Sequence, residues 1–267
     1  MDNKERRALR GELNDSFIEK YDDCSYGELL GLLDSLDARE RSVSVRLLSE
    51  KYADEELLHL LVSHFSSENA LYTRLELSSA LVGFGELAVP YLVRLLGVVG
   101  DNHEDGLPFK FFNKKSYPLV RDLSGRTLVK IGGVCIPYLI DLLASDVDLF
   151  VKWQAVDVVG GIVSQGGVGE DDIVSLVALF RGLMDVDVLS RWRVVRAFSG
   201  FKGSDFVFNL VYGVLISDKH VPVLWECIRS LCFIDAESVL WDDIVLRFGG
   251  CDDHNIRLAL DFRDRFL

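Results

Sequence analysis

The sequence predicts an all-α fold, an α-α superhelix (solenoid) of about seven helical hairpins that forms one domain over residues 1–267. Three observations predict it: a segment of the chain is repeated, apolar residues recur at spacings of three and four, and only five prolines interrupt the 267 residues. Such spacings place apolar side chains on one side of a helix. A hairpin with one apolar side has to stack on its neighbours to bury it.

Residues 74–96 are repeated at 121–143 with a constant offset of 47 residues. In both copies a helical stretch ends at a glycine, Gly85 or Gly132, and a Pro-Tyr-Leu sequence opens the next helix at Pro90 or Pro137. Glycine is common just after a helix, and proline is tolerated in the first helical turn because its missing N–H has no partner there. The repeated unit is therefore a helical hairpin.

An early basic residue in the second helix of each hairpin marks the repeat. The marker positions are Arg46, Arg74, Arg121, Lys152, Arg191, Leu224 and Arg257. Most intervals lie near 30 to 40 residues, which is typical of two-helix repeats, and the long interval indicates an inserted loop at 100–116. The second helices are expected at 39–52, 71–84, 117–131, 150–163, 189–202, 221–234 and 254–267, with residues 1–25 as an N-terminal cap.

Charge is distributed unevenly over this pattern. The net charge is −13, yet the expected second helices carry 17 basic and 8 acidic residues, against 12 basic and 34 acidic elsewhere. The overall charge disfavours nucleic acid and anionic lipid as partners, whereas the second helices favour an acidic ligand. Five cysteines without a CxxC pair, and no apolar stretch near the roughly 18 to 20 residues that span a membrane, indicate a cytoplasmic protein.

The Pro-Tyr-Leu opening after a glycine-ended helix, together with the early arginine, resembles the HEAT repeat, particularly its short prokaryotic variants. The resemblance covers about residues 26–267 and is strongest in the second to fourth units. It implies a HEAT or armadillo-like solenoid, and interaction with other macromolecules as its default role.

The basic second helices are the first candidate site. Three cations, Arg191, Arg193 and Arg196, stand in an expected helix without an acidic residue, so they are candidates for binding an acidic partner segment on the concave face. The alternative is a ladder in which each marker residue pairs with an Asp of the neighbouring turn. We favour this ladder for Arg74, Arg121 and Lys152.

Aromatic residues extend this candidate site. Trp153, Trp192 and Trp225 each follow a marker position and should lie on one face. Half-exposed tryptophans beside arginine often anchor partners, although burial between repeats is equally compatible with the pattern.

The inserted loop is the second candidate, because Phe109, Phe111 and Phe112 need burial either on the solenoid or in a partner. Packing on the solenoid is the favoured alternative.

No catalytic, metal or cofactor site is expected, since the five histidines are dispersed and the glycine-rich stretch lacks the Lys-Ser/Thr of a phosphate loop. Trp153, Asp157, Arg191 or Arg193, and Trp225 are similar in order and approximate spacing to the site of HEAT-like alkylpurine DNA glycosylases. That resemblance implies a carboxylate that stabilises positive charge on the sugar, and an arginine that holds phosphate. We expect a non-catalytic protein-protein interaction scaffold, with a DNA-binding protein or glycosylase as the alternative.

Overall fold

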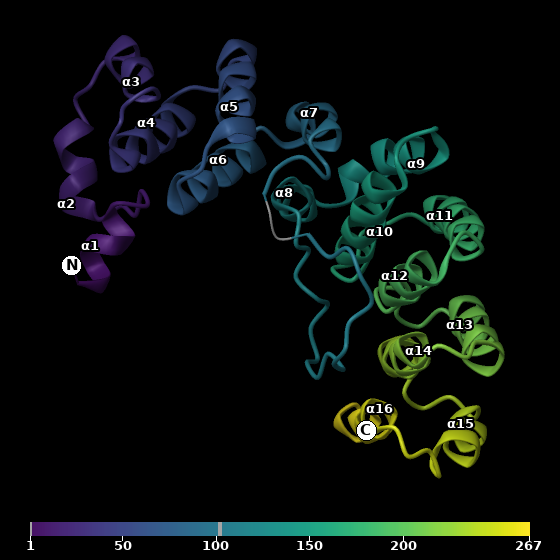
Figure 1. Cartoon of the computed structure of the whole chain (residues 1–267). Coiled ribbons are helices and arrows are strands. Elements are labelled where there is room, and N and C mark those ends of the chain that lie inside the picture. The colour runs from purple at the N-terminus through teal and green to yellow at the C-terminus, as the bar shows by residue number, and fades with distance from the viewer. Residues whose placement is uncertain (1, 101–102) are drawn as a thin grey trace. The chain divides into compact units, whose positions relative to one another are not determined.

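The structure, a computed structural model, describes residues 2–100 and 103–267 (Figure 1). Throughout these residues every regular element is a helix, which confirms the all-α class. The chain divides into two compact units, Met1–Asp101 (unit 1) and Asn102–Leu267 (unit 2). The single domain over 1–267 stays a prediction.

Unit 1 consists of short N-terminal helices followed by two hairpins. Its elements are α1 (Asn3–Ala8), α2 (Asp15–Ile18), η1 (Glu19–Tyr21), α3 (Tyr26–Leu32), α4 (Ala38–Lys51), α5 (Glu55–Ser67), α6 (Leu71–Gly83), η2 (Gly85–Ala88) and α7 (Val89–Arg94). The N-terminal segment contacts α4 and α6, because the Tyr72 N–H donates to the Arg10 carbonyl (2.9 Å) and Gly11 approaches Ser42 too closely for any larger residue. The capping role of residues 1–25 stays a prediction.

Unit 2 contains four consecutive hairpins. Its elements are α8 (Leu123–Ile131), η3 (Gly133–Cys135), α9 (Ile136–Ala144), α10 (Leu149–Val163), α11 (Glu170–Met184), α12 (Val188–Phe198), α13 (Asp205–Ser217), α14 (Val221–Ile234), α15 (Trp241–Phe248), α16 (His254–Phe262) and η4 (Arg263–Arg265). Helices α10, α12, α14 and α16 pack on one another in order. Helices α9, α11, α13 and α15 form a second row on their outer side (Figure 1). This alternation is an α-α superhelix. The described residues thus give six hairpins within the units, two in unit 1 and four in unit 2, against about seven predicted.

The inner helices of unit 2 are buried on nearly all sides. In α10 every residue from Gln154 to Val163 is buried, and α14 is buried throughout Trp225–Cys232. Gly160 makes the close packing possible, because a Cβ there would lie 2.8 Å from the Ala197 Cα of α12. A helix that is buried all round has covering structure on both faces, so one face must be covered by something other than the outer helices.

The marker residue stands at the fourth position of each second helix, which confirms Arg74, Lys152, Arg191, Leu224 and Arg257. Two positions were wrong: the equivalent residues are Arg41 rather than Arg46 in α4, and Arg126 rather than Arg121 in α8.

The helix expected at 117–131 begins only at Leu123. Asp122 caps it by accepting the Gly125 N–H (2.7 Å), and an aspartate in the extended conformation at this position stops the helix from starting earlier.

Candidate functional site

Residues 103–117, which we call the strap, contain no helix and run along the inner helices of unit 2 (Figure 1). The strap is the described part of the inserted loop expected at 100–116, of which residues 101 and 102 lie outside the described residues. We call the side formed by α10, α12, α14 and α16 the second-helix face. Side chains from each of these helices contact the strap.

A buried charge network holds the first part of the strap. The Asp157 carboxylate of α10 accepts from Arg193 Nη1 (2.6 Å) and Arg196 Nη2 (2.6 Å) of α12. Arg196 Nη1 also donates to Glu104 Oε2 of the strap (2.7 Å), and Arg193 donates to the Glu104 carbonyl. Asp157, Arg193 and Arg196 are all buried. The two arginines therefore join α10 to the strap.

The network keeps its charges despite burial. Burial alone would raise the pKa of the Glu104 carboxyl, but the positive charges of Arg196, Arg193 and Arg121 outweigh it and hold that pKa below its ordinary value. Burial would also lower the pKa of Arg196, yet Asp157 and Glu104 outweigh it and raise that pKa. The strap carboxylate is therefore ionised at neutral pH.

Backbone groups of the strap are bound by side chains further along the face. Arg229 of α14, fully buried, donates from Nε to the Phe112 carbonyl (3.2 Å) and from Nη2 to the Ser116 carbonyl (3.2 Å). Its Nη1 is paired with Glu226 (2.8 Å). Asn255 of α16 accepts the Phe111 N–H (3.0 Å). These bonds are made to the main chain and do not require a particular strap sequence.

Two of the three phenylalanines pack on the helices. The Phe111 ring is 8% exposed and makes edge contacts with Trp225 (5.6 Å between ring centroids) and Phe262 (5.5 Å). Phe112 lies beneath the Arg229 guanidinium, 5.0 Å from its ring centroid. Phe109, by contrast, is 95% exposed. The favoured expectation that the loop packs on the solenoid therefore holds for Phe111 and Phe112 and is wrong for Phe109.

A cavity of about 680 Å³, the strap cavity, lies between the strap and helices α8, α12 and α14. Trp192 and Trp225 contribute its aromatic lining. Two acidic residues line it, Glu104 and Glu226, against five basic residues: Lys110, Lys114, Arg121, Arg126 and Arg196. This excess of cations suits an acidic ligand.

Of the two alternatives that the sequence left open for the tryptophans, the structure has burial for Trp192 and Trp225. Trp192 is 2% and Trp225 1% exposed, and Phe111 of the strap packs on Trp225. Trp153 is half-buried, donates from Nε1 to Ser190 Oγ (2.8 Å) and lies beside Arg193. The three residues do follow one another on the inner helices, so their positions were predicted and their exposure was not.

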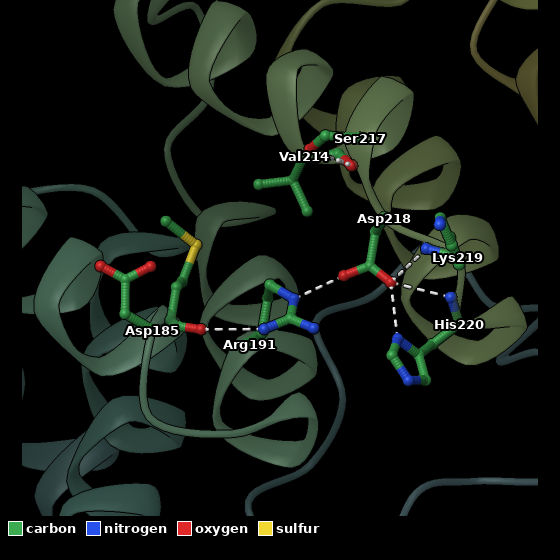
Figure 2. Close-up of a pocket in the computed structure, with 8 residues that line it drawn as sticks. Asp185, Arg191, Val214, Ser217, Asp218, Lys219 and His220 are labelled. Atoms are coloured by element: carbon green, nitrogen blue, oxygen red, sulfur yellow. Dashed lines mark hydrogen bonds and ion pairs between the residues drawn. The ribbon is translucent and has the colours of Figure 1, made fainter.

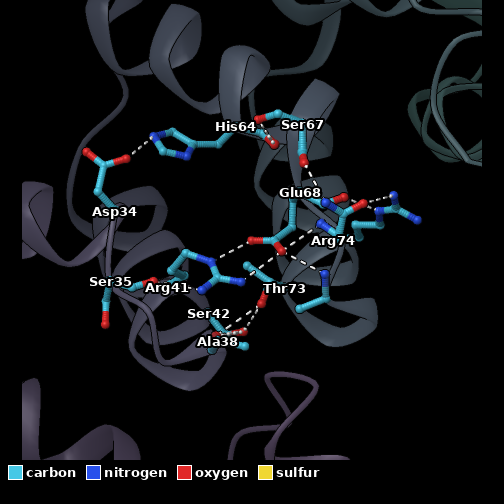
Figure 3. A network of polar contacts seen from close by, with 12 residues as sticks. Asp34, Ser35, Ala38, Arg41, Ser42, His64, Ser67, Glu68, Thr73 and Arg74 are labelled. Carbon is cyan, nitrogen blue, oxygen red and sulfur yellow. Dashed lines mark hydrogen bonds and ion pairs between the residues drawn. The ribbon is translucent and has the colours of Figure 1, made fainter.

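Arg191 belongs to a structural ladder and is not part of the strap site. Figure 2 shows its Nε donating to Asp218 (2.5 Å), which also accepts the N–H groups of Lys219 and His220. Two charged residues that line the adjoining cavity of about 430 Å³, Arg191 and Asp218, thus already pair with each other. Arg41 and Glu68 repeat the arrangement in unit 1, at 2.7 Å (Figure 3).

The ladder was expected to use Arg74, Arg121 and Lys152. In the structure it is formed by Arg41 with Glu68 and by Arg191 with Asp218. Arg74 donates to the Glu68 carbonyl within its own hairpin (Figure 3). Arg121 lies 3.7 Å from Glu104 of the strap. The carboxylate partners, Glu68 and Asp218, stand at the ends of α5 and α13, where they also cap the following loop.

Sequence reasoning missed Arg229, Glu226 and Asn255 as functional residues. A signal for the first two was present, since a charged pair at i, i+3 inside the apolar helix Val221–Ile234 indicates a buried polar role. Asn255 had no such signal.

The residues of the glycosylase alternative do not form an open pocket. Asp157 is buried and its carboxylate is already bound by two arginines, while Trp225 is buried under Phe111. That alternative stays a prediction that this geometry does not favour.

The described ranges of the chain are residues 2–100 and 103–267. They contain no group of three or more His, Cys, Asp or Glu side chains arranged to hold a metal ion. No single helix in them is long and apolar enough to cross a membrane, although Leu123–Ile131 and Gly133–Ala144, bent by 116°, would reach that length and composition together.

No protein-family model matches the chain, and no curated protein matches its sequence. Among solved structures it is similar to an engineered protein from the Northeast Structural Genomics Consortium, with 18% identity over 95% of this chain and 98% of that one and a TM-score of 0.41. A second engineered protein from that consortium has 17% identity over 95% of this chain and 100% of that one, with a TM-score of 0.40. A computationally designed armadillo repeat protein for modular peptide recognition has 12% identity over 91% of this chain and 100% of that one, with a TM-score of 0.36.

Proposed function

We propose that this chain is a non-catalytic protein-binding scaffold whose unit 2 holds an extended, acidic segment of a partner protein on the second-helix face. The observation that carries the proposal is the way this face binds the strap. Side chains of α12, α14 and α16 donate to or accept from the main chain at Glu104, Phe109, Phe111, Phe112 and Ser116. A surface that binds one extended segment through its backbone can bind others.

The charge of the face supports an acidic partner. Without Glu104, the buried arginines Arg193, Arg196 and Arg229 are opposed by the carboxylates Asp157 and Glu226 alone. A buried charge left without a partner is strongly destabilising, so a segment in the place of the strap has to supply a carboxylate. The cations around the strap cavity favour the same ligand.

Three expectations from the sequence belong to this proposal: a HEAT-type repeat, a cytoplasmic location and the absence of a cofactor. The five cysteines are all free thiols in the structure, which suits a reducing compartment.

A peptide selection tests the proposal. Random peptides displayed on phage are selected on the immobilised full chain, and the affinities of recovered peptides are measured by fluorescence anisotropy. We expect recovered peptides to be rich in Asp and Glu. Arg121→Glu, which reverses a partly exposed cation of the strap cavity, should weaken them by about fivefold or more, the size of a surface ion pair near 1 kcal/mol.

The matched control is Arg181→Glu, an exposed arginine on the outer helix α11. It should leave the affinity unchanged. Recovery of no peptide, or equal affinities in the two variants, would overturn the proposal. Release of alkylated base from DNA at low salt, abolished by Asp157→Asn under conditions where that variant is still folded, would establish the glycosylase alternative instead.

A further inference from the structure

We infer that the strap is a built-in ligand of the second-helix face, and that its own chemistry specifies the partner segment that displaces it. That chemistry is a carboxylate, Glu104, followed after six residues by two adjacent phenylalanines, Phe111 and Phe112. The inference rests on the proposed function, because it concerns the same face and the same partner.

The bonds of the strap resemble those of a bound peptide more than those of a packed loop. Within residues 103–117 one backbone-backbone hydrogen bond is present, from the Lys114 N–H to the Phe112 carbonyl (3.1 Å). Five backbone groups of the same segment are bound instead by side chains of Arg193, Arg229 and Asn255. The strap thus takes its conformation from the helices that it contacts.

The strap fits the face incompletely. The strap cavity remains beside it, and the large apolar Phe109 side chain is left exposed. Three buried donors on α10 and α12 have no acceptor among the described protein groups: Gln154 Nε2, Trp192 Nε1 and Arg193 Nε. A buried donor without an acceptor destabilises the folded state. Trp192 also lines the strap cavity, so a segment that placed a carbonyl or carboxylate oxygen beside its Nε1 would bind more tightly than the strap does.

The strap also sets a threshold for binding. Because it is joined to the chain at both ends, it competes at an effective concentration on the order of millimolar. A free peptide with the same contacts therefore occupies little of the face at micromolar concentration. A partner has to make additional contacts, or the strap has to be weakened.

A peptide added in trans tests the inference. The probe is a fluorescein-labelled peptide with the sequence of residues 103–117, and its anisotropy is measured with the full chain. The loosened variant Glu104→Ala/Phe111→Ala, which removes both anchors from the strap, should bind it at least about tenfold more tightly than the wild type.

Phe109 supplies the matched controls, since it lies in the same segment but is exposed. The chain variant Phe109→Ala should behave as the wild type. A probe peptide that carries Phe109→Ala should bind the loosened variant, and one that carries Glu104→Ala and Phe111→Ala should not. A folded loosened variant that binds the probe no better than the wild type would overturn the inference.

A second measurement avoids variants that fail to fold. Hydrogen exchange of the wild type is followed with millimolar ¹³C-labelled probe, so that fragments of the probe and of the chain differ in mass. Amides at 109–112 of the chain should exchange faster as the strap leaves. Unchanged exchange at saturating probe would contradict displacement.

The two proposals fail in different ways. Selected acidic peptides that depend on Arg121 but bind the wild type and the loosened variant equally would support the proposed function and overturn the built-in ligand. In the opposite case, the probe binds the loosened variant but the selection recovers no peptide. This result would support the built-in ligand and overturn the role for external partners.

Discussion

Asp157 is the residue on which the inner charge network depends. Among residues 2–100 and 103–267, it is the one carboxylate that forms ion pairs with both Arg193 and Arg196, at 2.6 Å each, and it is buried with them. Glu104 contacts the same pair from the strap, where it is partly exposed. Loss of Asp157 therefore leaves two buried cations with a single carboxylate that belongs to a loop.

Asp157→Asn should lower the free energy of unfolding by about 3–5 kcal/mol, the usual effect of breaking a buried pair by removing one partner. Urea unfolding at neutral pH, followed by circular dichroism, measures it. Asp141→Asn on the exposed side of α9 is the control and should change stability by less than about 0.5 kcal/mol. Equal effects of the two substitutions would show that water reaches Asp157 despite its burial.

At the scale of the element, the ends of the outer helices carry the contacts between hairpins. Glu68 ends α5, accepts the N–H groups of Asn69 and Ala70 (2.8 and 2.7 Å) and binds Arg41 of the preceding hairpin. Asp218 does the same at the end of α13. Each carboxylate therefore joins two hairpins and the turn between helices at once.

The Glu68 carboxylate should make the stability of unit 1 depend on pH. Burial alone would raise its pKa, but Arg41 and the Ala70 and Asn69 N–H groups hold that pKa below 4.5. A carboxyl group whose pKa is lower in the folded state stabilises that state. Its contribution is complete when the pH is above its pKa in the unfolded chain, and it is lost as the pH falls through its pKa in the folded chain. Glu68→Gln should thus be less stable than wild type at pH 7, with a smaller further loss on acidification.

Urea unfolding at about pH 7 and about pH 3 measures this difference. The control is Glu50→Gln on the exposed side of α4, which should lose as much stability on acidification as the wild type. If the stability of Glu68→Gln depends on pH as that of the wild type does, the Glu68 carboxylate contributes nothing to the pH dependence of stability.

For the molecule as a whole, periodicity predicted the hairpins and could not predict the strap. The 47-residue repeat, with Gly85 and Gly132 before proline-opened helices, is a local signal that the structure reproduces. The strap has no periodicity, so nothing in it specifies which face it covers. Its partners lie far away in sequence, as with Arg196 and Glu104, which are 92 residues apart.

The exposure of the tryptophans, which the sequence left open, could not be predicted for the same reason. Trp192 and Trp225 occupy the inner face that their spacing indicates. An inner face is normally open to solvent in a solenoid, whereas here both tryptophans are buried and Phe111 of the strap packs on Trp225. Arg193 and Arg196 pair with Asp157 of α10, and Arg196 also pairs with Glu104 of the strap, so their acidic partners lie in other elements.

The cysteines should report on unit 2 as a whole. Cys135, Cys227 and Cys232 are buried and all lie in unit 2, whereas Cys24 and Cys251 are half-buried. Burial raises the pKa of Cys232 to about 12 and that of Cys227 well above its ordinary value, so almost no reactive thiolate is present at neutral pH. Alkylation of the native chain, read by mass spectrometry, should modify Cys24 and Cys251 first. Early modification of Cys227 would contradict this packing.

The strap also changes how unit 2 should fold. Contacts between adjacent hairpins join residues some 35 apart, such as Ser230 and Val195, whereas the Phe111 N–H and Asn255 are 144 residues apart. A solenoid with neighbour contacts alone can fold from any repeat and lose its ends one hairpin at a time. A segment anchored on α12, α14 and α16 raises the contact order, which slows folding, and links the C-terminal hairpin to the rest in one cooperative transition. A chain without strap anchors should fold faster and fray from α16.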